Sequence, residues 1–237
     1  MSDESPPRIT GPLLVAVALT AAAGFVDAHL FLHVVQVFVA NMSGNVVLMG
    51  MSIGDGHWSR AGMHLLSITL FTVGVAGGTV VHDRRRASGR PLRPDLVLAC
   101  EAVLLVAVIA LRVIEGPTTP LSIEGMDIPV IALGALAMGL QTVVIGRVGS
   151  VAVATTYESG AVARVGEEAA LASRAPENDH RARHLRVVQV LGAVVVAYAA
   201  GAAFAAAVGA SPAWLLVPLA VVGAVAVRIR QSSARMP

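Results

Sequence analysis

Six long apolar segments constrain this chain more than any other feature of its sequence. They cover residues 11–32, 61–81, 96–111, 128–145, 187–210 and 211–227. Only two charged residues, Asp27 and Glu101, lie within them, and the whole chain is 14% charged, against about 25% in soluble domains. A helix of about 20 residues crosses a hydrocarbon core about 30 Å thick. The sequence therefore predicts an all-α polytopic membrane protein, with six transmembrane helices in a single membrane domain over residues 1–237.

Arginine residues predict which ends of these segments face the cytoplasm. They cluster in three places, 84–93, 174–186 and 228–235. Residues 115–127 contain acidic side chains and no basic one. Because basic loops stay on the cytoplasmic side, the pattern predicts a multi-pass protein of the bacterial inner membrane with both termini cytoplasmic. In the six-span topology, segments 35–54 and 149–170 do not cross the membrane fully. The sequence itself leaves open whether these two segments span or re-enter.

The sequence also carries one pair of motifs twice. Gly-Phe-Val-Asp at 24–27 precedes Asn-Met-Ser-Gly-Asn at 41–45. Gly-Leu-Gln-Thr at 139–142 precedes Tyr-Glu-Ser-Gly-Ala at 157–161, so the copies lie 115 and 116 residues apart. This offset is about half of the chain, which indicates that the protein is built from two related halves.

The number of spans determines how the two halves are oriented. With three spans in each half, the second half must insert upside down relative to the first. We therefore predict two inverted 3+3 repeats, residues 10–114 and 127–230, each with a broken or re-entrant segment. In secondary transporters, such halves hold the solute between polar interruptions at matching positions. Irregular backbone at membrane depth is tolerated only where protein buries it or where it lines a watery cavity.

The order and spacing of these motifs resemble the YoaK-like family of bacterial membrane proteins, catalogued as domain of unknown function 1275. The resemblance covers residues 10 to 230 and rests on four motifs: Gly-Phe-Val-Asp-Ala, Asn-Met-Ser-Gly-Asn-Val-Val-Leu-Met-Gly, Ala-Met-Gly-Leu-Gln and Thr-Thr-Tyr-x-Ser-Gly. It implies about six transmembrane helices and carries no established activity. Glu158 departs from the family-like pattern, in which a less polar residue is expected.

Polar residues within the apolar segments are the candidates for a solute or ion site. Asp27 is the strongest, because an aspartate at the centre of a spanning helix costs about 2.5–3.5 kcal/mol to insert. The alternative is a structural carboxylate that caps the broken segment. The polar residues of the two interruptions would line the site, or would form hydrogen bonds with the backbone groups that the broken helices leave unpaired. The candidate set is Asp27, Asn41, Ser43, Gly44, Asn45, Gln141, Thr142, Thr155, Thr156, Tyr157, Glu158, Ser159 and Gly160.

Four other polar residues receive structural interpretations. Glu101 is expected to snorkel to the cytoplasmic face or to pair with a loop arginine. His29 and His33 are four residues apart, a spacing that can bind a metal, but the sequence places no cysteine or second carboxylate near them. We therefore predict no metal site. His64 is expected to form a hydrogen bond between helices.

These features favour a permease or transporter for a small polar solute or ion, working by alternating access, with the lipid bilayer as its surroundings. We expect no cofactor, no catalytic residue and no nucleic-acid partner; a homo-oligomer is left open. The first alternative is a membrane enzyme acting on lipid, with Asp27 or Glu158 as acid or base. The second is a non-catalytic membrane partner or sensor. The sequence specifies neither the substrate, the coupling ion nor the direction of transport.

Overall fold

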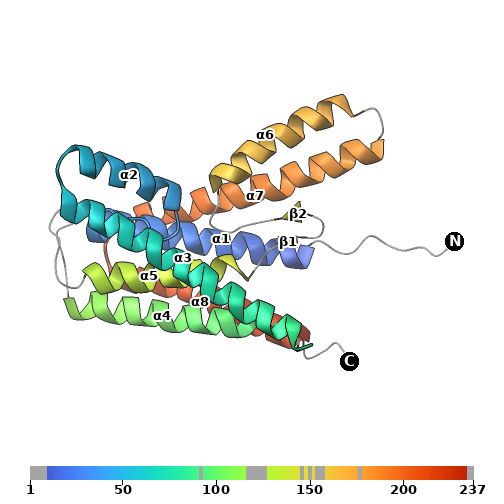
Figure 1. Cartoon of the computed structure of the whole chain (residues 1–237). Coiled ribbons are helices and arrows are strands. Elements are labelled where there is room, and N and C mark those ends of the chain that lie inside the picture. The colour runs from blue at the N-terminus through green and yellow to red at the C-terminus, as the bar shows by residue number, and fades with distance from the viewer. Residues whose placement is uncertain are drawn as a thin grey trace.

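The computed structural model describes residues 10–90, 93–115, 127–144, 147–148, 151–152, 158–175 and 178–233, and it is almost entirely helical (Figure 1). In chain order the elements are α1 (Thr10–Leu30), the π-helix η1 (Phe31–Val35), α2 (Met42–Gly54), α3 (Trp58–Ala87), α4 (Pro94–Glu115), α5 (Asp127–Thr142), strands β1 (Arg147–Val148) and β2 (Val151–Ala152), α6 (Glu158–Arg174), α7 (Asn178–Val208), the 3-10 helix η2 (Pro212–Leu215) and α8 (Leu216–Ser233). The two strands pair over two residues each. The predicted all-α class is confirmed.

Five of the described helices are long and apolar enough to cross a membrane. They are Gly11–Val34, Trp58–Ala87, Pro94–Glu115, Asn178–Val208 and Pro212–Ser232. The remaining expected span forms α5, which is apolar but only 16 residues long. That length is below the roughly 20 residues that cross a bilayer unaided. The structure thus supports a multi-pass helical membrane protein, and the count of six spans stays a prediction.

Large apolar side chains on the outside of the bundle agree with this assignment. Val103, Ile114 and Val196 are 68%, 73% and 67% exposed, and similar residues occur along α3, α4 and α7. Soluble monomers rarely expose contiguous apolar surface on this scale, because water penalises it. The exposed apolar surface is therefore expected to contact lipid.

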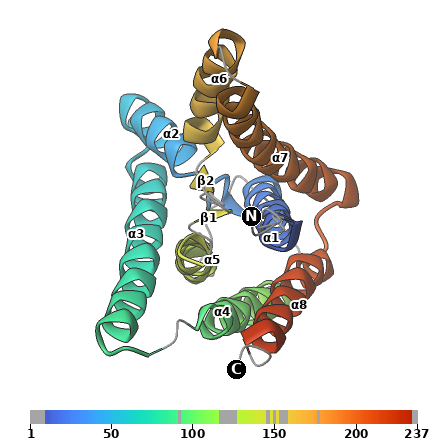
Figure 2. The ribbon, with the colours of Figure 1, turned by 90° about the vertical axis from the view of Figure 1, so that its right-hand side faces the viewer.

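Helices α1 and α5 lie inside the bundle, and the long helices surround them (Figure 2). The most apolar part of the first span is 61% buried, whereas the corresponding parts of the other four spans are 22–33% buried. The two repeated motifs at 24–27 and 139–142 belong to these inner helices. The fold therefore places both motifs in protein and away from lipid.

Helix α1 crosses α7 at very short range, through glycine. A Cβ added to Gly24 would lie 2.2 Å from the carbonyl oxygen of Tyr198, and one added to Gly201 would lie 2.0 Å from that of Ala21. No real Cβ tolerates such distances. The two backbones therefore touch at this crossing, as small residues allow in membrane helices.

Helix α5 crosses α3 in the same way. A Cβ on Gly139 would lie 2.3 Å from the carbonyl oxygen of Phe71, and one on Gly74 would lie 2.6 Å from that of Leu136. The two crossings correspond residue by residue. Their equivalent pairs are Ala21 with Leu136, Gly24 with Gly139, Phe71 with Tyr198, and Gly74 with Gly201. The inner helix of each half therefore packs against a long helix of the other half.

Candidate functional site

The first polar interruption begins where helix α1 ends. The helix continues as the π-helix η1 and ends at Gln36, whose φ of 57° and ψ of 36° are left-handed. Gln36 has the only positive φ of a non-glycine residue in the described part of the chain. Such a conformation is uncommon for a residue with a Cβ, and it turns the chain out of the helix. We call residues 36–41 the break.

Helix α2 starts immediately after the break, with Asn41 as its N-cap. The side-chain oxygen of Asn41 accepts hydrogen bonds from the Gly44 amide at 3.0 Å and from the Ser43 hydroxyl at 2.9 Å. A side chain at Gly44 would meet the Phe38 ring at 2.9 Å. These three candidate residues therefore start a helix, which is the capping role expected of Asn before a helical turn.

Asp27 binds the break from within α1, and its side chain is 1% exposed. Its Oδ1 accepts hydrogen bonds from the amides of Val39 at 2.6 Å and Ala40 at 2.7 Å, and its Oδ2 accepts one from the Asn41 amide at 2.9 Å. The hydroxyl of Tyr198 in α7 also donates to Oδ2. The carboxylate thus accepts hydrogen bonds from backbone amides of the break that have no helical partner. This is the structural alternative for Asp27, a carboxylate that caps the broken segment.

Asn45 holds the other side of the break and is fully buried. It accepts a hydrogen bond from the Phe38 amide at 3.0 Å and donates to the Phe38 carbonyl oxygen at 2.6 Å. Ser67 in α3 donates to the same carbonyl at 2.6 Å. Nδ1 of His64 lies 3.2 Å from the Asn45 side-chain oxygen, which confirms the expected helix–helix hydrogen bond of His64. Since that oxygen is an acceptor, the contact favours a proton on Nδ1 and leaves Nε2 as an acceptor.

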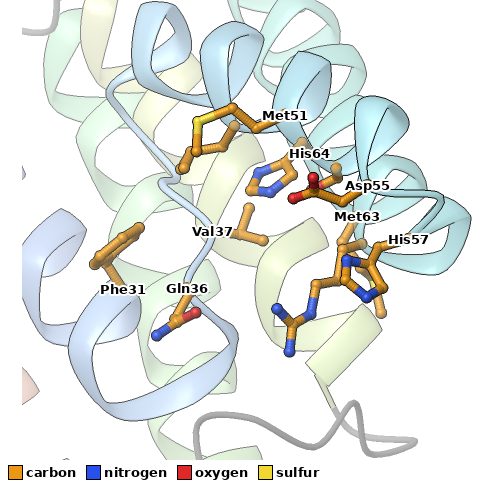
Figure 3. Close-up of a pocket in the computed structure, with 11 residues that line it drawn as sticks. Phe31, Gln36, Val37, Met51, Asp55, His57, Met63 and His64 are labelled. Carbon is orange, nitrogen blue, oxygen red and sulfur yellow. The ribbon is translucent and has the colours of Figure 1, made fainter.

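A cavity of about 150 Å³ lies between the break, α2 and α3. Its polar lining is Gln36, Ser52, Asp55, His57, Arg60 and His64, and its apolar lining is Phe31, Val37, Leu48, Met51 and Met63. Figure 3 shows Asp55, His57 and His64 on the α2–α3 side, and Phe31 and Gln36 on the opposite side. A volume near 150 Å³ equals about five water molecules at about 30 Å³ each, so the cavity suits a small polar molecule.

Hydrogen bonds connect this cavity to the contact between the halves. His64 on the cavity wall contacts Asn45, and Asn45 binds both polar atoms of Phe38. The residues after Phe38 bind Asp27, which in turn accepts the hydrogen bond of Tyr198. Asp27 itself does not line the cavity. The cavity and α7 are thus two ends of one polar network.

The second interruption is less completely described. Gln141 is fully buried and donates to the Leu19 carbonyl at 2.9 Å, and the Thr142 hydroxyl donates to the Met138 carbonyl at 2.9 Å. Thr155, Thr156 and Tyr157 lie outside the described residues, as do the side chains of Glu158 and Ser159. Gly160 lies in the first turn of α6. The predicted meeting of the two interruptions therefore stays a prediction.

The family model described as "Protein of unknown function (DUF1275)" matches residues 15–229. The chain belongs to this family. It is also 27% identical over 184 residues to the "UPF0700 transmembrane protein YoaK" of Bacillus subtilis (strain 168), a match that covers 78% of each chain. No solved structure matches it. The resemblance inferred from the motifs is confirmed, and the relative's name agrees with a membrane protein.

Two features of this DUF1275 protein were missed by sequence reasoning. The sequence suggested no role for Tyr198, although its hydroxyl is one of two polar side-chain groups in the apolar segment 187–210, with Gln189. The cavity residues Asp55, His57 and Arg60 were also missed, because they lie in the connection between two apolar segments. Their clustering within six residues was a usable signal, because three neighbouring polar side chains can line one cavity.

The expectation for Glu101 was wrong. Its side chain is fully buried, and neither carboxylate oxygen has a hydrogen-bond partner among the described residues. Glu101 lies on the same stripe of α4 as Leu98, Leu105 and Val108, which faces the protein core. The side chain therefore points into the bundle and cannot snorkel to the cytoplasmic face.

Proposed function

We propose that this chain is a permease for a small polar solute, built from six spanning helices in two inverted 3+3 repeats. The observation that carries the proposal is the polar cavity beside the break, connected by hydrogen bonds to the contact between the halves. A solute that hydrogen-bonds the cavity wall can thereby bias how the halves pack. This is the coupling that alternating access needs.

The helix directions support the inverted arrangement. In Figure 1, α1, α4 and α7 run toward the end that carries the α2–α3 connection, and α5, α8 and α3 run away from it. Each helix of the first half thus runs opposite to its counterpart in the second. The matching glycine crossings at Gly24 and Gly139 support the same equivalence. A helix of 16 residues is about 24 Å long, which suffices for α5 because it lies inside the bundle.

The arginine-rich segment 84–93 supports an outward-facing cavity. It begins in the last turn of α3, at the end opposite to the α2–α3 connection, and basic segments stay in the cytoplasm. The cavity would therefore open to the outside. Its lining combines the Asp55 carboxylate, the Arg60 guanidinium and the Gln36 amide. These groups match a small solute with both hydrogen-bond donors and acceptors, zwitterions included.

The proposal gives the candidate residues two kinds of role. Asn45 positions His64 at the cavity, and Asp27, Asn41 and Gly44 shape the break next to it. Direct contact of Asp27 with the solute stays a prediction for a rearranged state, since here its oxygens bind the chain itself.

Uptake into proteoliposomes across a panel of small polar solutes tests the proposal. Asp55→Asn and His64→Ala should each reduce uptake, because both side chains line the cavity. Asp83→Asn is the matched control, since Asp83 is exposed at the other end of α3 and should leave uptake unchanged. Thermal melting in detergent shows whether each variant is folded. Undiminished uptake by both cavity variants, for every transported solute, would remove this cavity from the mechanism.

A non-catalytic membrane partner or sensor is the second candidate, favoured by the complete pairing of Asp27 with the break and Tyr198. Such a protein would bind solutes in the cavity without moving them. Solute binding measured by calorimetry, together with no uptake of any solute that binds, would favour this candidate over a permease.

A further inference from the structure

Glu101 stands apart from the polar network at the break. Both of its oxygens are inaccessible and lack a hydrogen-bond partner among the described residues. It lies seven residues after Pro94, about 10 Å along α4, and therefore well inside the spanning segment. Burying an isolated carboxylate anion is so costly that such a group is expected to take up a proton. Acidic residues in this position are functional by default.

The elements packed against α4 offer no charge to compensate Glu101. These elements are α5, α8 and η2. On α5 the titratable group is Asp127, which begins the helix near the opposite end of α4. On α8 the charged groups are Arg228 and Arg230, both exposed in its last turns. On η2 there is none. No ion pair of Glu101 is present among the described residues.

A proton fits this site better than a metal ion does. A hard metal cation needs about six oxygen ligands, whereas a proton needs a single oxygen. Within the described residues, no group of three or more His, Cys, Asp or Glu side chains is placed to hold a metal. Glu101 provides the single acceptor, and its neighbours on the buried face, Leu98 and Leu105, are apolar.

The place of Glu101 in the fold suggests how it can be used. Helix α4 belongs to the first half and α8 to the second, and they pack against each other. Leu98, Leu105 and Val108, which share the stripe of Glu101, belong to a core cluster that also contains residues of α5 and α8. Movement of one half against the other would therefore open this contact and give the carboxyl group access to water.

We propose that Glu101 binds a proton on the buried face of α4, which packs against α5 and α8 of the second half, and that this proton is the coupling ion of the permease. The first part stands on the buried carboxyl group alone. The second part rests on the proposed function. When the halves move, Glu101 gains water, releases its proton and becomes anionic; closing the contact requires that it be protonated again.

Labelling with dicyclohexylcarbodiimide tests proton binding on the full chain in proteoliposomes at neutral pH. The carboxyl proton passes to a carbodiimide nitrogen, the carboxylate oxygen adds to the central carbon, and rearrangement leaves an N-acylurea. We expect the peptide containing Glu101 to gain the mass of one carbodiimide. A water-soluble carbodiimide is the control: it should label the exposed Glu167 and leave Glu101 unmodified. Because the carboxyl group is fully buried, the reagent reaches it only when the contact opens, so absence of the apolar adduct would overturn the proposed opening of this contact.

Infrared difference spectroscopy provides a second measurement. The wild-type protein should show the high-frequency carbonyl band of a carboxylic acid without hydrogen-bond partners. Glu101→Gln should lose this band, because glutamine fills the same space without an acidic proton. An unchanged band in a folded Glu101→Gln variant would show that another group is the protonated one and would overturn the assignment.

The coupling role has its own readout. Glu101→Gln should retain solute exchange between two pools and lose accumulation driven by a pH gradient. Full gradient-driven accumulation by this variant would overturn the coupling role. A labelled Glu101 in a protein that transports nothing would overturn the proposed permease and leave the proton site standing, so the two failures are distinguishable.

Discussion

The hydroxyl of Tyr198 donates a hydrogen bond to Oδ2 of Asp27 and so joins α7 of the second half to the end of α1 in the first. The equivalent positions of the other half are Phe71 and Thr142, which cannot form this bond. The two glycine crossings match residue by residue, but the polar bond exists at one of them alone. The break in the first half is therefore linked to α7 through Asp27.

Tyr198→Phe removes that bond and keeps the aromatic ring. A phenylalanine ring is compatible with this position, since Phe71 occupies the equivalent position in the crossing of α3 and α5. Loss of one hydrogen bond to a buried carboxylate should lower the free energy of unfolding by about 1.5–3 kcal/mol. Thr72→Val is the control, because the Thr72 hydroxyl is exposed and bonds its own helix at 2.8 Å. Thermal melting in detergent compares the two variants. Equal melting temperatures would show that the Tyr198 bond contributes nothing.

Asp27→Asn should destabilise the protein more strongly. Asparagine keeps one acceptor oxygen and turns an NH₂ group toward amides that are themselves donors, leaving buried groups unsatisfied. The expected loss is about 3 kcal/mol in the free energy of unfolding. Size-exclusion chromatography measures the folded fraction, and uptake is then expressed per folded molecule. Undiminished uptake on that scale would exclude Asp27 from solute binding.

Alanine at the crossing glycines should force the helices apart. Gly201→Ala and Gly139→Ala each place a Cβ within 2.3 Å of a backbone oxygen, and should cost about 1–3 kcal/mol through overpacking. Gly192→Ala in α7 is the control. Nothing lies within 4 Å of its Cβ, and alanine is the better helix former there. Melting temperatures that fall equally in all three variants would contradict this view of the crossings.

Single cysteines test the six-span topology. In a Cys100→Ala background, Ser88→Cys and Asp179→Cys should be labelled by an impermeant maleimide from the cytoplasmic side alone, because they lie within two of the arginine clusters. Asp55→Cys and Ser211→Cys should be labelled from outside alone. Labelling of Asp179→Cys from outside would mean that α5 does not span or that segment 149–170 does, and it would exclude the inverted 3+3 arrangement.

Much of the fold was readable from the sequence because hydropathy is a local property. Five of the six predicted apolar segments form long helices, and the polar motif at 41–45 lies where the break ends and α2 begins. The capping role of Asn41 was also accessible, since an N-cap bonds within one turn of itself.

The partners of the isolated polar groups were not readable in this way. Asp27 could be recognised as costly in a membrane, but its donors lie 12 to 171 residues away. The sequence placed Glu101 near a helix end. It did not show which face of α4 points into the bundle, and that face carries Glu101. The cavity required that Gln36, Asp55 and His64 be brought together across three elements.

The sequence by itself determined that this chain is a helical membrane protein with a polar break after its first span, because hydrophobicity, charge and glycine act over a few residues. Tertiary structure alone decided which polar group each buried side chain meets. In a membrane interior every polar group takes whatever partner the neighbouring helix presents, and that depends on helix rotation and crossing. Helix rotation and crossing make Asp27, the strongest sequence candidate, the cap of the break. They leave Glu101 buried without a partner among the described residues.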